Sequence, residues 1–303
     1  MRVDPEMALR RGAKIVHEQG GDLPHDQIIA ALTVATRLDT RRVADEDIPL
    51  GATRFGGRPD LPASLDWPRW EGFTQPDGPY AQDYKPAPLA FLAQLNLAEV
   101  PDGSGLLPET GWLCFFYEAD QQPWGFDPRH RGSFQVIYFD GDPRTLVRRA
   151  LPDGLGDYAR FEPALVTSTL TATLPPSLSV RAVKLPDDAD QAYDRLVTAL
   201  ANEDGVTHHR LLGWPNQVQR AMERECQLVS HGYFLGDANL RRDERVEQLE
   251  ATASDWTLLL QVDTDEEGPG WIWGDVGYIY FWIRKQDLTA RRFGQAWLIL
   301  QCY

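Results

Sequence analysis

Short runs of hydrophobic residues alternate along this chain with segments rich in glycine and proline, a pattern typical of β-strands joined by loops. The densest run is Tyr-Ile-Tyr-Phe-Trp-Ile at 278–283, which follows a tryptophan-rich turn holding Gly274 and Gly277. Six successive aromatic or β-branched residues predict a strand that is covered on both faces. Further strands are predicted at 27–39, 91–97, 111–118, 134–139, 164–174, 256–262 and 296–301, and 145–148 is expected to pair with 134–139.

Helical spacing of apolar residues is confined to a few segments. It predicts helices over 5–19, 186–202, 216–225 and 239–252. In the second of these, the acidic run from Asp187 to Asp190 favours a helix start, since negative charge stabilises a helix N-terminus. The stretch 51–70 holds too much glycine and proline for regular structure, so it is predicted to be a long, shaped loop.

Two strand-forming segments carry a central glutamine, Gln94 in Phe-Leu-Ala-Gln-Leu-Asn-Leu and Gln261 in Leu-Leu-Leu-Gln-Val-Asp-Thr. Each is followed by an aromatic run and then by a closing strand, and each is preceded by a loop of Gly, Trp and Pro. The aromatic runs begin at Gly111 and Gly277, so two successive strands recur at nearly the same spacing. This recurrence predicts an internal duplication.

A duplicated antiparallel unit is expected to pack as a pseudo-symmetric pair, because each half has a two-faced apolar sheet that the other half must cover. The predicted fold is therefore α+β and β-rich, with internally duplicated antiparallel sheets forming a roll and a few peripheral helices. One fused domain is expected over 1–303. Its predicted parts are an N-terminal helical extension (1–27), a first β repeat (28–150), a connecting strand and helix (151–204) and a second β repeat (205–303).

The net charge of −15 bears on the partners of the protein. An acidic surface repels phosphate backbones and anionic lipids, so neither nucleic acid nor membrane is an expected partner, whereas a basic protein is compatible. No apolar run approaches the length of a membrane span, and the first residues contain no apolar signal core. The three cysteines have no Cys-x-x-Cys spacing, which favours a reducing compartment. We expect a cytoplasmic protein.

Motifs of known chemistry are weak in this sequence. The glycine pattern from Gly154 to Ala159 lacks the preceding strand of a dinucleotide site. The carboxylates Asp263, Asp265 and Glu267 start like an EF-hand loop, but the twelfth place of that loop holds Gly274, so a solvated hairpin turn is expected. The sequence therefore predicts no catalytic residue, no metal site and no cofactor.

Ligand sites often lie in the crevice between duplicated halves, where polar side chains from the strands meet aromatic walls. An alternative reading of the same residues is structural. The glutamine amides would then satisfy loop backbone, Asp275 would accept backbone N–H groups, and most tryptophans would be core. The candidate ligand contacts are Arg54, Trp67, Gln94, Trp214, Gln261, Trp273 and Asp275.

Four motifs together resemble the bacterial YwqG family, a domain of unknown function. They are Gly56-Gly-Arg-Pro-Asp-Leu-Pro62, Phe91-Leu-Ala-Gln-Leu-Asn96, Leu260-Gln-Val-Asp-Thr-Asp265 and Trp273-Gly-Asp-Val-Gly-Tyr-Ile-Tyr-Phe-Trp-Ile283. The resemblance runs from about residue 28 to 303 and implies a β-rich roll with a few peripheral helices, without a known reaction. Some members of such families accompany contact-dependent toxins, which implies an immunity-type, partner-binding role by analogy.

The expected function is thus a non-enzymatic binding or interaction module whose partner is a basic protein. The alternative is a small-molecule binder or an enzyme that uses the crevice between the two repeats. A deep cavity lined by the seven candidate side chains would favour the alternative, and a filled junction would favour the interaction module.

Overall fold

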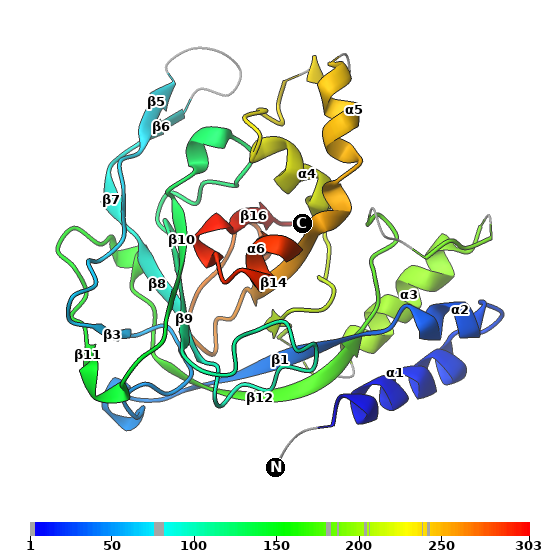
Figure 1. Ribbon diagram of the computed structural model, residues 1–303, viewed down its shortest axis with the longest axis horizontal. Helices are drawn as coiled ribbons and strands as arrows, with labels where there is room; N and C mark the ends of the chain where they lie inside the picture. The colour runs from blue at the N-terminus through cyan, green and yellow to red at the C-terminus, as the bar shows by residue number, and fades with distance from the viewer. Residues whose placement is uncertain are drawn as a thin grey trace.

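A computed structural model describes residues 4–75, 82–179, 183–186, 188–202, 205, 207–237, 239–240 and 243–303. In this part of the chain ten strands form one antiparallel sheet, in the order β10-β9-β8-β2-β12-β1-β13-β14-β15-β16. The sheet curls until it is nearly closed (Figure 1). Its strands are β1 (Thr33–Arg42), β2 (Arg54–Phe55), β8 (Ala90–Asn96), β9 (Trp112–Tyr117), β10 (Phe134–Phe139), β12 (Ala164–Thr173), β13 (Arg210–Leu211), β14 (Trp256–Asp263), β15 (Tyr278–Arg284) and β16 (Trp297–Gln301).

Aromatic side chains from the two ends of the sheet fill its interior. Phe115 of β9 packs edge-on against Phe281 of β15, with 5.1 Å between ring centroids. Phe134 of β10 meets Trp297 of β16 at 5.2 Å. All four side chains are buried, so the two ends cover each other's apolar faces. The β-rich fold predicted from the hydrophobic runs is confirmed, and the strand at 278–283 is buried along its length.

Corresponding strands on the two sides of the sheet have the same register. Arg54 lies opposite Gln94 where β2 pairs with β8, and Arg210 lies opposite Gln261 where β13 pairs with β14. A register shift interrupts both β8–β9 and β14–β15, three residues before the glutamine in each case, at Phe91 and Leu258. Between the two sides, β1 and β12 pair along all ten of their residues.

Three two-stranded sheets lie outside the main sheet. They are β3 (Asp60–Pro62) with β11 (Leu146–Arg148), β4 (Arg69–Trp70) with β7 (Ala87–Pro88), and β5 (Phe73–Gln75) with β6 (Gln82–Tyr84). The expected pairing of 145–148 with 134–139 is therefore wrong. Arg148 instead donates to Asp60 Oδ1 at 2.8 Å and to the Ile48 carbonyl at 2.9 Å, which holds β11 on the 51–70 segment.

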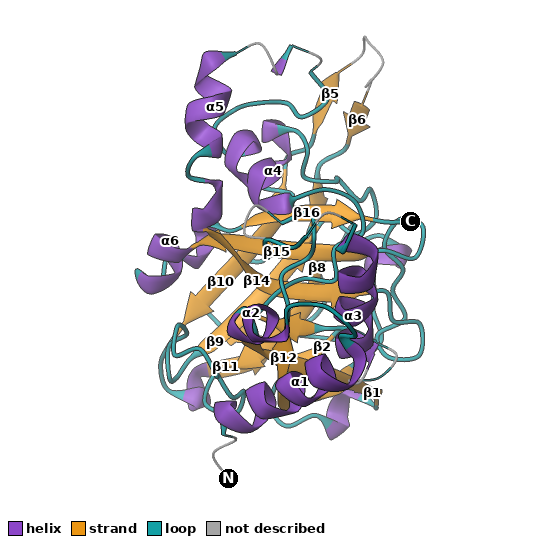
Figure 2. Ribbon diagram, turned by 90° about the vertical axis from the view of Figure 1, so that its right-hand side faces the viewer, coloured by secondary structure: helices purple, strands orange, loops and turns teal. Residues whose placement is uncertain are grey.

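Helices cover the sheet at two places. Figure 2 shows α1 (Pro5–Gln19), α2 (His25–Ala30) and α3 (Asp190–Asn202) grouped near β1 and β12, and α4 (Met222–Val229) and α5 (Glu244–Glu250) at the opposite end. The short helix α6 (Lys285–Thr289) follows β15. Within the described residues, no helix is both long enough and apolar enough to span a membrane.

The helix predicted at 5–19 is confirmed at both ends. Asp4 caps it by accepting the Glu6 N–H at 2.9 Å, and Pro5 occupies the first turn. The strand predicted at 27–39 begins only at Thr33. Its first residues form α2, because Ile28 is drawn into the apolar cluster between α1 and α3.

Three other helices begin later than their sequence pattern predicted. The helix expected over 239–252 is α5, which runs only from Glu244 to Glu250. The helix expected at 216–225 starts at Met222, because the Asn216 N–H donates to Gln261 and the N–H groups of Val218 and Gln219 donate to Gln301. These hydrogen bonds to side-chain acceptors keep the segment before Met222 out of a helix. Helix α3 starts at Asp190, and Asp187, expected at its start, lies outside the described residues.

Candidate functional site

The candidate residues of the first half are held by internal bonds. Arg54 is fully buried and pairs with Asp45. Gln94, beside it, accepts the Asp60 N–H at 2.8 Å and donates to the Ala52 carbonyl at 3.0 Å. The half-buried Trp67 donates to the Leu89 carbonyl at 2.9 Å. These bonds tie the 51–70 segment to β8.

The candidate residues of the second half are bonded in the same manner. Gln261 accepts the Asn216 N–H at 2.7 Å and donates to the His208 carbonyl at 2.5 Å. The indoles of Trp214 and Trp273 are buried, and they donate to Thr33 Oγ1 and to the Asp263 carbonyl respectively. The side chain of Asp275 is exposed. The structure thus brings Arg54 and Gln94 together, and none of the seven residues lines either cavity described below.

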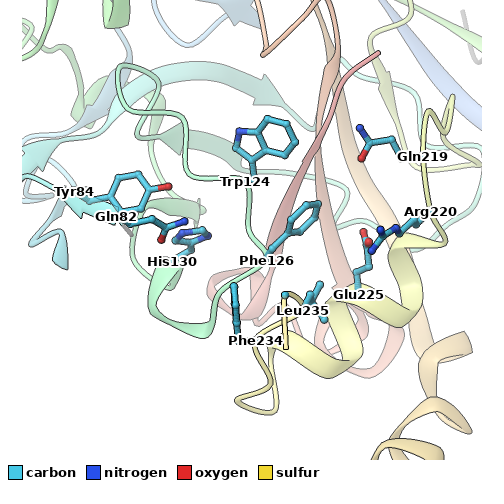
Figure 3. A pocket seen from close by; sticks show the side chains of 11 residues that line it. Gln82, Tyr84, Trp124, Phe126, His130, Gln219, Arg220, Glu225, Phe234 and Leu235 are labelled. Carbon is cyan, nitrogen blue, oxygen red and sulfur yellow. The ribbon is translucent and has the colours of Figure 1, made fainter. Parts of the chain in front are cut away.

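A cavity of about 460 Å³ lies between the β5–β6 hairpin and α4, which stand on either side of one end of the sheet (Figure 1). We call it the aromatic cavity. Figure 3 shows Tyr84 and His130 on one side of it, Arg220 and Glu225 on the other, and Phe126 between them. Its lining residues are Gln82, Tyr84, Trp124, Phe126, His130, Gln219, Arg220, Glu225, Phe234, Leu235 and Gly236.

The aromatic wall formed by Trp124 and Phe126 is fixed by backbone contacts with the second half of the chain. Between these two residues, Gly125 accepts the indole N–H of Trp297 at 2.9 Å. Gly125 has φ of 82°, and a Cβ there would lie 1.9 Å from the Leu298 carbonyl oxygen. Only glycine permits this approach. The Leu235 N–H donates to the Phe126 carbonyl at 3.0 Å, which joins the wall to the opposite side of the cavity.

His130 contributes a neutral hydrogen-bond donor. Its Nδ1 accepts the Gly125 N–H at 3.0 Å, so the proton of the neutral ring is carried by Nε2. Burial lowers the pKa of His130 from 6.5 to about 4, against the attraction of the Asp127 carboxylate. Nε2 is shielded from solvent and has no hydrogen-bond partner among the residues that the structure describes. An unused donor is therefore fixed at this wall.

Glu225 contributes a carboxyl group from the opposite wall, on α4. The residue is 4% exposed. Burial raises the pKa of Glu225 from 4.5 to about 7, although the charge of Arg220 and a hydrogen bond with Gln301 act in the opposite direction. Its Oε2 has no hydrogen-bond partner within the described part of the chain. A carboxyl group that titrates near neutral pH beside a cavity is typical of functional sites.

A second cavity of about 340 Å³ lies beside the first, and Gln219 lines both. It is lined by His208 and Tyr278, among other polar residues. His208 Nδ1 lies 3.4 Å from Asp263 Oδ2. Asn216 also lines this cavity, and its side-chain oxygen accepts a hydrogen bond from Gln261. Gln261 therefore supports the cavity wall through Asn216.

The acidic turn after β14 is not the solvated hairpin that the sequence predicted. Asp263 and Asp265 are both buried. Asp265 accepts from Thr40 Oγ1 at 2.5 Å and from the Gly268 N–H at 2.8 Å, and its Oδ2 lies 3.2 Å from His209 Nε2. These bonds outweigh burial and lower the pKa of Asp265 to about 2. Across the described residues, no group of three or more His, Cys, Asp or Glu side chains is placed to hold a metal ion.

Sequence reasoning missed the residues that line the aromatic cavity. His130 was not among the candidate residues, and Glu225 lay at the end of the helix predicted over 216–225. The run Trp124-Gly-Phe126 was the one available signal, since it places a glycine between two aromatic residues outside any predicted strand.

The sequence was compared with known families and proteins. The profile of a family described as a domain of unknown function, DUF1963, matches residues 53–302. This range contains all the lining residues of the aromatic cavity and nine of the ten strands of the main sheet. No curated protein matches the chain significantly. Because the match covers most of the sequence, the chain belongs to the DUF1963 family.

Proposed function

We propose that the protein binds a small molecule in the aromatic cavity. The observation that carries this proposal is that three solvent-shielded polar atoms without described partners belong to residues that line one cavity, Oε1 of Gln82 and Nε2 of His130 on one side and Oε2 of Glu225 on the other. A buried polar atom without a partner costs about 1–3 kcal/mol, so native proteins rarely keep one without a role.

The size and lining of the cavity support the same proposal. Its volume of about 460 Å³ suits a small organic molecule, since ligand pockets span roughly 300–1,000 Å³. Tyr84, Trp124 and Phe126 offer apolar surface, and polar groups lie in two sets, Gln82 and His130 on one side and Gln219, Arg220 and Glu225 on the other. A ligand that reaches both walls would recover these unmade hydrogen bonds while burying its apolar body.

Ligand screening by thermal shift tests this function. At a concentration 100 times its Kd, a bound metabolite is expected to stabilise the protein by about 2.7 kcal/mol. Leu235→Trp narrows the aromatic cavity and should abolish the stabilisation. Leu106→Trp adds the same bulk at a residue outside the lining that is 42% exposed, and should keep the stabilisation. A broad library without hits, or hits that persist in Leu235→Trp, would refute the proposal.

We also propose that the sheet arose by internal duplication. The strand order reads alike from both ends, and the β2–β8 and β13–β14 pairs both place an arginine opposite a glutamine. After the arginine, Gly57 and Gly213 both have positive φ, at 63° and 70°. In this arrangement β12 is the counterpart of β1, so the second repeat would begin within the 151–204 connection instead of at residue 205.

If the two halves arose by duplication, the two glutamines should contribute equally to stability. Gln94→Leu leaves the Asp60 N–H without its acceptor, and Gln261→Leu leaves the Asn216 N–H without its acceptor. Each substitution is expected to cost about 1–3 kcal/mol, because a buried donor loses its partner. Gln135→Leu, at an exposed site on β10, is the control and should change little. Chemical denaturation measures all three, and a large cost for one glutamine alone would argue against equivalent roles.

Partner binding is a separate proposal. The net charge of −15 favours a basic protein partner, and the resemblance of four motifs to the YwqG family favours a cytoplasmic, immunity-type role. Affinity capture from the native cell that returns no specific basic partner would count against it.

A further inference from the structure

The ionisable groups around the aromatic cavity are unequal in burial. Glu225 is buried, whereas Arg220, the cationic side chain of the lining, is exposed to solvent. His130 is neutral at pH 7, since the pKa of its ring is about 4. The charge of Arg220 offsets the burial of the Glu225 carboxylate only in part, and no ion pair of Glu225 forms among the described residues. A ligand cation can therefore complete the pairing.

From this geometry we infer that the cavity selects an organic ammonium compound, with the ammonium group at Glu225 and the apolar body against the rings of Trp124 and Phe126, which pack edge to face on each other. The inference rests on the proposed small-molecule function and names the class of its ligand. Aromatic rings attract cations through their π-faces, so the lining favours the same charge as the carboxylate does. The Nε2–H of His130 would donate to a hydroxyl or carbonyl oxygen at the far end of the ligand.

None of the charged groups described around Glu225 forms an ion pair with it, so a ligand cation can do so. On the same helix, Arg224 pairs with Glu250 at 2.6 Å, and Glu223 accepts from Ser179 at 2.5 Å. The strand β16 presents the neutral amide of Gln301. The remaining titratable groups of the lining are His130 and Tyr84, both across the cavity, and Arg220 at the solvent side.

Binding of an ammonium ion is linked to proton release. The carboxylate is the form that pairs with a cation, and the pKa of Glu225 is about 7 in the free protein. Affinity should therefore be about tenfold higher at pH 8 than at pH 6, and about half a proton should be released per ligand at pH 7. An anionic ligand, or a neutral one that accepts from the protonated carboxyl, would show the opposite pH dependence.

Three probes with one hydroxyphenyl body separate these classes: tyramine, which is an ammonium, tyrosol, which is neutral, and phloretate, which is an anion. Isothermal titration calorimetry at pH 6 and pH 8 is expected to show tyramine binding best, with the tenfold pH effect. Glu225→Gln should weaken tyramine at least tenfold at pH 8 and remove the pH effect. Glu223→Gln replaces a neighbouring buried carboxylate that is outside the lining, and should preserve both.

The outcomes separate this inference from the function on which it rests. Binding of phloretate or tyrosol as tight as that of tyramine overturns the ammonium class, and if that binding is lost in Leu235→Trp, the small-molecule function stands. Tyramine binding that is unchanged by pH and by Glu225→Gln also overturns the inference. If none of the three probes binds, the ammonium class is overturned for this body, and the library screen decides the function.

Discussion

Asp45→Asn is expected to destabilise the protein by about 3–5 kcal/mol, because it removes the ion-pair partner of a fully buried guanidinium. Within the described residues, Nε and Nη1 of Arg54 have no hydrogen-bond partner, so the charge depends on the bond from Nη2 to Asp45. The same carboxylate also pairs with Arg58 at 2.8 Å. Denaturant unfolding at neutral pH measures the loss.

The pH range of this contribution follows from the pKa of Asp45. Burial alone would raise that pKa, but the hydrogen bond and the charge of Arg54 outweigh burial and lower it. The stabilisation is therefore present above the ordinary value of 3.8 and is lost as the pH falls through the lower native value. Asp142→Asn breaks an exposed pair with Arg144 and serves as the control. A loss no larger than that of the control would contradict the role of Asp45.

Glu225→Gln is expected to stabilise the free protein by about 3 kcal/mol at pH 8, an unusual direction for a buried substitution. The estimate follows from the rise of the pKa from 4.5 to about 7, at about 1.4 kcal/mol per pKa unit. The protonated carboxyl stabilises the fold below pH 4.5, and this contribution is lost as the pH rises through 7. The glutamine amide carries no charge that burial would desolvate, so the variant does not lose this stability as the pH rises.

His130 responds to pH in the opposite direction. Its pKa falls from 6.5 to about 4 on folding, so its contribution is present above 6.5 and is lost as the pH falls through 4. In the wild type, between about pH 4.5 and 6.5, the stability lost at Glu225 as the pH rises is offset by the stability gained at His130. Glu225→Gln should therefore lose stability on acidification more steeply than the wild type does. Equal stability of the two proteins at pH 8, with Glu266→Gln as the exposed control, would contradict a buried carboxylate.

Much of the fold was predictable because hydrophobic runs report burial directly. The run at 278–283 and the segment at 134–139 are strands at or near their predicted bounds. The two-residue strands β2 and β13 were not predictable, since a pair of residues has no periodicity. The late start of α4 depends on the side chain of Gln301, which is distant in sequence.

The candidate site was harder to predict than the fold for a physical reason. The glutamines were correctly identified as buried amides that need partners, but their partners are loop backbone groups within the protein. The lining of the aromatic cavity comes from three separate segments, 82–84, 124–130 and 219–236. None of these carries a motif, and the perturbed pKa values of His130 and Glu225 arise only when tertiary packing buries them.

The central claim is that a buried carboxyl group without an ion pair lines a ligand cavity. Its most direct test is to titrate the Glu225 carboxyl itself. Carbon-detected NMR of glutamate-labelled protein, assigned by comparison with Glu225→Gln, follows this group from pH 4 to pH 9. We expect a midpoint near pH 7 in the free protein and a lower midpoint with saturating tyramine. A midpoint near 4.5, unmoved by tyramine or any screened ligand, would contradict it.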